Sequence, residues 1–363
     1  MENITYLFGA GASAQSMPVV KDFNFRLKEF KQYLQIFARR TEQDFEMVPL
    51  IRCLTRFIEE EKRHFSIDTY ARKIFIKHGG KFSNDYNELK AVLICYFLFE
   101  QMRKEGTYAY EQRDYDLPKK EAINNSLDKR YDALYAGIVT NEGNLPQQFK
   151  ILSWNYDIQV ELSYMGFHGK GFVDIASGLE VLYHNKQKIK QPFVVKLNGT
   201  CWTKEVVEIF KDTAYYSHCN ELFVIKSAPF DFFTMIFDRV LLANLFNILN
   251  FAWETDYKKD TRILEAKRIM GNTDILVITG YSFPNYNMHV DREIFSAASR
   301  VRKIFIQEIN LERHEIVRSR LNYLDSKLYK KVQPFTPDID LFLIPSEFYG
   351  DNVLPRPKPG KRS

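Results

Sequence analysis

Small and polar residues follow a short apolar run near the start of the chain, in the segment Y-L-F-G-A-G-A-S of residues 6–13. Gly9 and Gly11 lack a Cβ atom, so the backbone there can turn sharply and approach a ligand closely. The residues that follow could open a helix whose free N–H groups and dipole attract phosphate. The segment predicts a nucleotide-binding strand–turn–helix. A tight turn without a ligand fits it equally well, because Ala14 departs from the spacing G-x-G-x-x-G.

Four further apolar runs also end in polar or small residues. They cover residues 151–157, 194–200, 275–284 and 303–308. Continuous β-branched and aromatic runs of this kind are typical of strands buried on both faces of a parallel sheet. Ligands of open α/β sheets bind outside the carboxyl ends of the strands. We therefore expect an α/β fold with a Rossmann-like, mostly parallel sheet flanked by helices, and a ligand site at its carboxyl edge.

Four of these segments resemble the motifs of the sirtuin superfamily, in the same order along the chain. Residues 9–18 resemble its glycine-rich motif, with one residue fewer before the proline, and residues 153–157 (S-W-N-Y-D) resemble its T-Q-N-x-D motif. Residues 196–200 (K-L-N-G-T) resemble K-L-H-G-S, and residues 280–282 (G-Y-S) resemble G-T-S. The sequence G-Y-S-F of residues 280–283 resembles more closely the corresponding motif of bacterial sirtuin-like proteins of anti-phage systems. The resemblance implies a fold that binds and consumes NAD.

Two departures from the family narrow the expected chemistry. The histidine of H-G-S, which is the family's general base, is replaced by Asn198, whose amide has no useful proton-accepting pKa. The family's deacetylases also carry a zinc module with two C-x-x-C pairs. The cysteines of this chain are scattered, at positions 53, 95, 201 and 219. We therefore expect no metal site and no lysine deacetylation, whereas the part that binds and cleaves NAD is retained.

The resemblance implies a role for each motif residue in cleaving the glycosidic bond of NAD, through a transition state that resembles an oxocarbenium ion. Asn155 would hold the ribose or the attacking water, and Asp157 would accept a hydrogen bond from the nicotinamide carboxamide. Asn198 would hydrogen-bond a ribose hydroxyl. The residues expected to contact NAD elsewhere are Gly9, Ala10, Gly11 and Ser13 at the pyrophosphate, and Gly280, Ser282 and Glu308 towards the adenosine.

Each of these residues also has a purely structural interpretation. Asn155 and Asp157 could cap the helix that follows their strand, and Asn198–Gly199 is a common turn dipeptide. Ser282 could cap a helix. His289, shortly after the G-Y-S-F turn, could supply the missing base, but a surface or structural histidine is the more common case.

The periodicity of the chain predicts a discontinuous domain. Residues 26–144 show mostly helical spacing, so we expect a helical insertion within a sirtuin-like Rossmann domain of residues 1–25 and 145–350. Residues 351–363 alternate proline with basic residues and are expected to be disordered.

Two helical signals are more specific. Ser66 is expected to cap a helix that begins with the pattern S-I-D-T-Y-A, which resembles helical insertions of bacterial sirtuin-like defence proteins. A further helical stretch is predicted from about residue 230 to residue 253.

The composition excludes several classes of protein. The 363 residues include 51 basic and 46 acidic side chains, and the net charge of +5 is too small to indicate direct nucleic-acid binding. The longest apolar stretch, near residues 240–253, is interrupted by asparagines and cannot span a bilayer. Residues 1–20 do not resemble a secretory signal, and scattered cysteines indicate a reducing compartment. We expect a cytoplasmic protein without a membrane segment.

Three functions remain open on the sequence. The first is a NAD glycohydrolase that depletes the NAD of an infected cell. The second is a non-catalytic subunit that binds NAD or ADP-ribose and controls a partner, and the third is ADP-ribosyl transfer to a protein. Because a toxic NADase needs restraint, we expect control by assembly. The expected assemblies are a homo-oligomer, or a complex with a HerA-type ATPase or a short Argonaute encoded nearby.

Overall fold

The computed structural model shows one sheet of six parallel strands, in the order β3-β4-β2-β1-β5-β6. The strands are β1 (Ile4–Phe8), β2 (Phe149–Ser153), β3 (Val181–Leu182), β4 (Val194–Lys196), β5 (Ile275–Thr279) and β6 (Lys303–Gln307). The described residues are 2–19, 22–40, 48–64, 66–102, 127–168, 178–185, 187, 189–203, 205–206, 229–335 and 340–352. This sheet, with helices on its faces, confirms the expected α/β, Rossmann-like fold.

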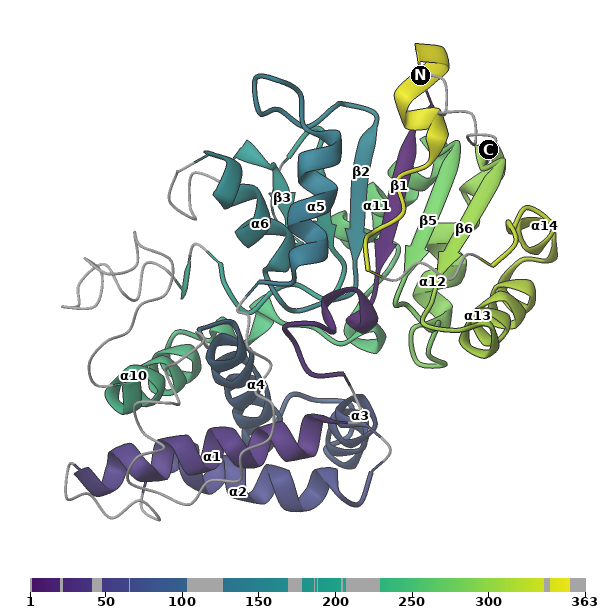
Figure 1. Ribbon diagram of the computed structural model, residues 1–363. Helices are drawn as coiled ribbons and strands as arrows, with labels where there is room; N and C mark the ends of the chain where they lie inside the picture. The colour runs from purple at the N-terminus through teal and green to yellow at the C-terminus, as the bar shows by residue number, and fades with distance from the viewer. Residues whose placement is uncertain are drawn as a thin grey trace.

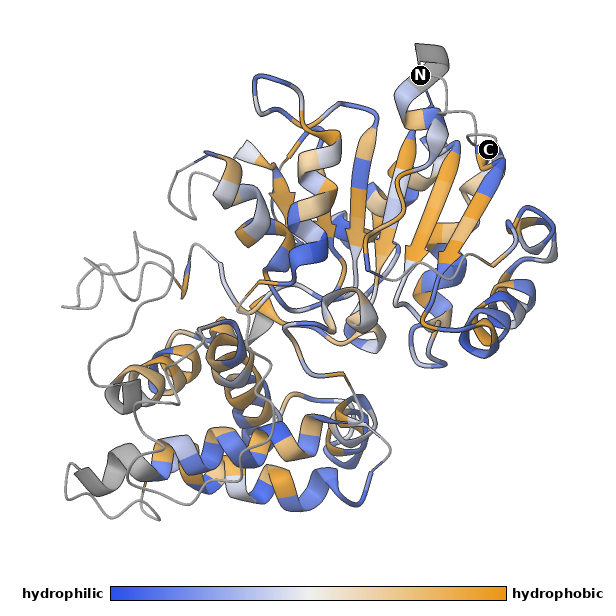
Figure 2. Cartoon of the chain, in the orientation of Figure 1, coloured by the Kyte–Doolittle hydropathy of each residue, from blue (hydrophilic) through white to orange (hydrophobic). Residues whose placement is uncertain are grey.

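Both faces of the sheet are buried, which explains why its strands are continuous apolar runs. Successive side chains of a strand point to opposite faces. In β1, Tyr6 and Phe8 enter one hydrophobic core, and Leu7 enters the other. Every residue of β1 and β5 is buried, and β5 is apolar along most of its length (Figure 2).

Some of the described helices cover the two faces of the sheet, and others pack together in a helical bundle (Figure 1). The face that carries Tyr6 is covered by α5 (Lys129–Ile138) and α6 (Gln159–His168). The opposite face is covered by α11 (Thr261–Asn272), α12 (Met288–Phe295) and α13 (Leu311–Leu324), with α14 (Ser326–Tyr329) beyond. Short 3-10 helices are η1 (Ala10–Ser13), η4 (Leu245–Ile248), η5 (Ala252–Glu254), η6 (Ala298–Arg300) and η7 (Ser346–Asn352).

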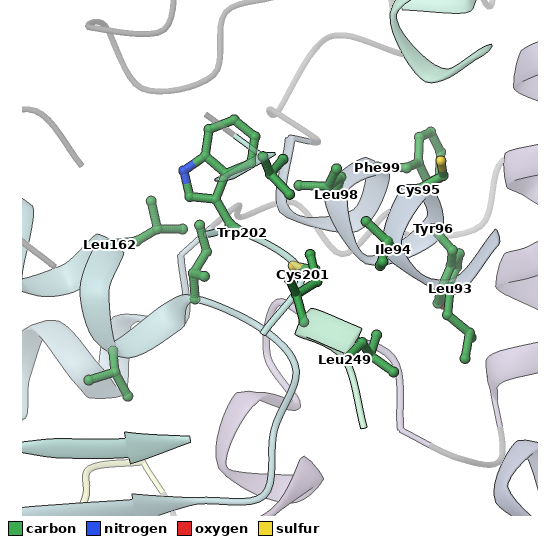
Figure 3. Close-up of a cluster of buried hydrophobic side chains, with 14 of the residues drawn as sticks. Leu93, Ile94, Cys95, Tyr96, Leu98, Phe99, Leu162, Cys201, Trp202 and Leu249 are labelled. Atoms are coloured by element: carbon green, nitrogen blue, oxygen red, sulfur yellow. The ribbon is translucent and has the colours of Figure 1, made fainter. Parts of the chain in front are cut away.

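The helical bundle lies beyond the carboxyl ends of the strands (Figure 1). It contains α1 (Phe23–Arg40), α2 (Pro49–Glu61), α3 (Ile67–Lys77), α4 (Asn84–Met102) and also α10 (Pro229–Leu242), which follows β4 in the chain. Rings of α1 and α10 meet directly, since the Phe30 and Phe233 centroids are 5.1 Å apart. Side chains of α4 lie near Cys201, Trp202 and Leu249 (Figure 3). The bundle therefore shares a continuous apolar core with the sheet.

Two helix boundaries can be compared with the sequence-based expectations. Ser66 caps α3 as expected, because its side chain accepts a hydrogen bond from the Thr69 N–H at 3.3 Å. The predicted stretch over residues 230–253 is not one helix: α10 ends at Leu242, and Asn244 has a left-handed φ of 53° before two short 3-10 turns. Most of the predicted disordered tail, residues 353–363, lies outside the described residues.

The order of the strands reverses at β1. On one side of β1 lie β2, β4 and, at the edge, β3, although β3 precedes β4 in the chain. The later strands β5 and β6 lie on the other side of β1. Ligands in open α/β sheets bind at such a reversal, outside the carboxyl ends of the strands. Within the described ranges, no helix combines the length and apolar character needed to cross a bilayer.

Candidate functional site

The glycine-rich turn after β1 is joined, backbone to backbone, to the turn after β5. The Gly9 N–H donates to the Thr279 carbonyl at 3.1 Å, and the Gly11 N–H donates to the Gly280 carbonyl at 3.1 Å. Gly280 has a φ of +62°, and a Cβ placed there would lie 2.3 Å from the Ala12 nitrogen. The close approach that these glycines permit is therefore an approach between two protein turns.

Asn155, at the end of β2, joins the same turn from the other side. Its Nδ2 donates to the Gly9 carbonyl at 2.9 Å and to the Ser13 hydroxyl at 3.3 Å. Asn155 is 7% exposed and Ser13 is fully buried. The sequence-predicted residues Gly9, Ser13 and Asn155 are thus brought into one hydrogen-bonded cluster. The turn after β5 adds Gly280 to it.

Asn198, after β4, belongs to the same edge of the sheet and has an unused acceptor. Its Nδ2 donates to the Trp154 carbonyl at 3.2 Å, which links the K-L-N-G-T and S-W-N-Y-D segments. Its Oδ1 is buried and has no hydrogen-bond partner among the described residues. Burying an unpaired polar atom costs about 1–3 kcal/mol. A ligand hydroxyl that donated to Oδ1 would remove this cost.

Asp157 lies in a buried cluster of charged side chains. Its Oδ1 accepts from the Gln159 N–H, the first residue of α6, at 3.1 Å, so it also serves as a helix cap. Burial raises the pKa of the Asp157 carboxyl, and the charge of Lys196 opposes that effect. The Lys196 ammonium donates to the Asp157 carbonyl at 2.6 Å and lies 3.2 Å from Glu161. Asp157 therefore caps α6, as its structural interpretation predicts. Its hydrogen bond with the nicotinamide carboxamide stays a prediction.

The remaining predicted residues lie at the same edge but are less enclosed. Ala10 and Ser282 are exposed, and the Ser282 carbonyl accepts from Arg320. Glu308 follows β6, and partial burial raises the pKa of its carboxyl. His289 is exposed, its ring meets the Tyr257 ring edge-on at 6.2 Å, and desolvation lowers its pKa.

The start of α5 contacts the glycine-rich turn in a way that the sequence interpretation missed. The Arg130 guanidinium donates to the Gly11 carbonyl at 3.2 Å and to the Ala12 carbonyl at 3.0 Å. Asp128 pairs with Arg130 at 2.6 Å and accepts from the Gln15 N–H at 3.1 Å. An aspartate directly before K-R-Y signals a helix N-cap, but nothing local shows that it reaches a turn more than a hundred residues away.

A second missed network lies beneath the turn after β5. The Tyr281 hydroxyl donates to Asp291 Oδ2 at 2.7 Å and accepts from Asn287 at 3.0 Å. The Tyr281 ring stacks on Trp154, with centroids 5.9 Å apart and planes 14° apart. This network fixes the G-Y-S-F turn against the S-W-N-Y-D segment. Burial raises the pKa of Asp291 to about 8, and the hydrogen bond from Tyr281 opposes that shift.

We expect the substitution Asp291→Asn to weaken the pH dependence of folding stability. An unfolded Asp titrates near pH 4, so between about pH 4 and pH 8 the folded protein binds the Asp291 proton more tightly. The stabilisation is complete below pH 4 and is lost as the pH rises through 8. Thermal melts from pH 5 to pH 9 should show a shallower decline for Asp291→Asn than for the parent protein. The exposed Asp85→Asn is the matched control, and parallel declines in all three proteins would contradict the expectation.

Comparison with protein-family models, with curated proteins and with solved structures finds no match to this chain. In the part of the chain that the structure describes, no three His, Cys, Asp or Glu side chains are grouped to hold a metal ion. Cys53, Cys95 and Cys201 are buried free thiols, and Cys219 lies outside the described residues.

Proposed function

We propose that this chain is a NAD glycohydrolase of a bacterial anti-phage system, similar to sirtuin-like defence proteins. The observation that carries the proposal is the meeting of four motif segments at one edge of the sheet. The turn after β1 is hydrogen-bonded to the end of β2 and to the turn after β5, and the turn after β4 is hydrogen-bonded to Trp154. These segments are far apart in the sequence and resemble one family's motifs in order.

The proposed reaction breaks the C1′–N bond of NAD and joins a water oxygen to C1′, releasing nicotinamide, ADP-ribose and one proton. Nicotinamide leaves as a neutral group with the bonding electron pair, so the protein needs to orient the ribose and the water rather than to protonate the leaving group. In this proposal the Asn198 Oδ1 accepts from a ribose hydroxyl, because it is a buried acceptor without a partner among the described residues. Asn155 stands beside the pyrophosphate turn and orients the ribose or the water.

A second function is favoured by the identity of residue 198. An amide cannot take a proton at neutral pH, and Asn155 already donates to the Gly9 carbonyl and to Ser13. Both facts fit a regulatory subunit that binds NAD or ADP-ribose without cleaving it. In either case we expect assembly control, by self-association or by an ATPase or Argonaute partner.

The experiment that separates the two functions is incubation of the purified chain with NAD, followed by chromatography of the products and calorimetric titration. Release of nicotinamide and ADP-ribose in equal amounts supports the glycohydrolase. Binding without release supports the regulatory subunit, and a protein mass increase that matches ADP-ribose supports transfer to protein. Asn198→Ala should lower turnover or affinity, since the ribose contact is lost. Unchanged values in that variant would contradict the role given to Asn198.

A further inference from the structure

Residues 248–254, here called the strap, are hydrogen-bonded to the turn that carries Asn198. The Asn250 N–H donates to the Asn198 carbonyl at 2.8 Å, and the Thr200 N–H donates to the Ile248 carbonyl at 3.0 Å. Gly199 has a φ of +75°, and a Cβ there would lie 1.9 Å from the Ile248 carbonyl oxygen. The strap thus lies directly against this turn and restricts where Asn198 can be.

The strap also contacts the segment that carries Asn155 and Asp157. The Tyr156 hydroxyl donates to the Asn250 carbonyl at 3.1 Å. The Tyr156 ring in turn lies 5.1 Å from the Phe97 ring of α4. Asn250 therefore connects the two polar strand ends, from β2 and from β4, through its own backbone.

At its other end the strap is held by the helical bundle through a buried ion pair. The Lys90 ammonium of α4 lies 2.8 Å and 2.9 Å from the two carboxylate oxygens of Glu254, and both side chains are almost fully buried. The Tyr86 hydroxyl also donates to Glu254. Glu254 Oε2 accepts from the Phe251 N–H at 2.7 Å, so the carboxylate fixes the strap backbone as well.

We propose that Glu254 is a positioning residue: paired with Lys90, it holds the strap and through it sets the orientation of Asn198 for NAD. The inference rests on the proposed function for its catalytic consequence. The bundle then acts on the turn that carries Asn198 through the strap, so a displacement of α4 is transmitted to Asn198. Burial lowers the pKa of Lys90 while the charge of Glu254 opposes that shift, which agrees with a pair that depends on both members.

The test compares Glu254→Gln and the double variant Lys90→Met/Glu254→Gln with Arg26→Met. The double variant leaves no unpaired buried charge, so it covers the case in which Glu254→Gln alone does not fold. Arg26 pairs with Glu29 and Glu100 inside the bundle, so its loss disturbs a buried ion pair of α4 that does not reach the strap. Each protein is examined by hydrogen–deuterium exchange and by nicotinamide release per folded molecule.

We expect both Glu254 variants to exchange faster in the peptides that cover residues 196–201 and 248–254. Turnover at saturating NAD should fall about tenfold, with a smaller change in KM, because a misplaced contact affects the reacting geometry most. Arg26→Met should speed exchange in the bundle alone and keep turnover. Parental exchange at residues 196–201 in both Glu254 variants, or parental turnover in both, would overturn the proposal. If the parent protein releases no nicotinamide, the proposed NAD glycohydrolase function is contradicted. The hydrogen–deuterium exchange data still decide whether Glu254 holds the strap.

Discussion

Replacing Asn155 by alanine should reduce nicotinamide release from NAD by about 100-fold or more, because an orienting contact to the reacting ribose or water is lost. The same change removes the donor to the Gly9 carbonyl and to Ser13. The stability loss should be only about 1 kcal/mol, since the Gly9 carbonyl also accepts from the Ala12 N–H at 2.9 Å. Turnover per folded molecule, measured well below the melting temperature, separates the two effects.

A matched control lies near the amino end of the neighbouring strand β1. Thr5 and Thr273 share a buried hydrogen bond of 2.7 Å, and Thr5→Val removes it with little change in shape. This variant should lose a similar amount of stability and keep parental turnover. If Asn155→Ala retains full activity while its stability falls like that of Thr5→Val, the amide is a structural bridge and the reaction centre lies elsewhere.

The sheet could be predicted from sequence because its central strands are buried on both faces. Five apolar runs that end in polar or small residues were identified in the sequence. They correspond to β1, β2, β4, β5 and β6. The strand β3 was missed, since its two residues Val181–Leu182 are too short to form a pattern. The helix predicted to reach residue 253 ends at Leu242, because sequence periodicity does not show that Asn244 adopts a left-handed conformation.

The site was only partly predictable, because its residues are joined by contacts between distant segments. The polar strand ends identified Asn155 and Asn198, which the structure places at one edge. The sequence could not show that Arg130 reaches the carbonyls of the glycine-rich turn, or that Glu254 binds Lys90. Charged residues on helices usually face water, so neither pairing has a local signal.

The glycines of the site show a related limit of sequence reasoning. A G-A-G turn indicates a close approach but not the atoms that approach. In the structure a Cβ on Gly11 would lie 2.7 Å from the Gly280 Cα, and one on Gly9 would lie 2.6 Å from the Gly280 carbonyl oxygen. The backbone of the neighbouring turn therefore explains these glycines already, and a ligand contact at them stays a prediction.

Gly280→Ala is accordingly expected to destabilise the fold by about 3 kcal/mol or more. The left-handed conformation costs a residue with a Cβ about 1–2 kcal/mol, and forcing an atom into packed surroundings costs about 1–3 kcal/mol more. The new Cβ would lie 2.4 Å from the Gly11 Cα and 2.3 Å from the Ala12 nitrogen, so the β1 and β5 turns must separate. Urea unfolding of the variant and the parent protein measures the loss.

Gly79→Ala is the control, because Gly79 has a similar φ of +66° and a Cβ there meets nothing within 4 Å. It should cost only the conformational part, about 1–2 kcal/mol, so the difference between the variants isolates the contact between the two turns. Equal losses would show that the turns after β1 and β5 separate freely and that the contact between them is weak.

Calorimetric titration of folded Gly280→Ala with NAD then tests whether the same turns bind the nucleotide. The turns that would hold the pyrophosphate are displaced in this variant, so its affinity for NAD should fall more than that of Gly79→Ala. If Gly280→Ala binds NAD with parental affinity although its stability is greatly reduced, the contact between the turns after β1 and β5 serves packing alone. NAD would then have to bind without that contact.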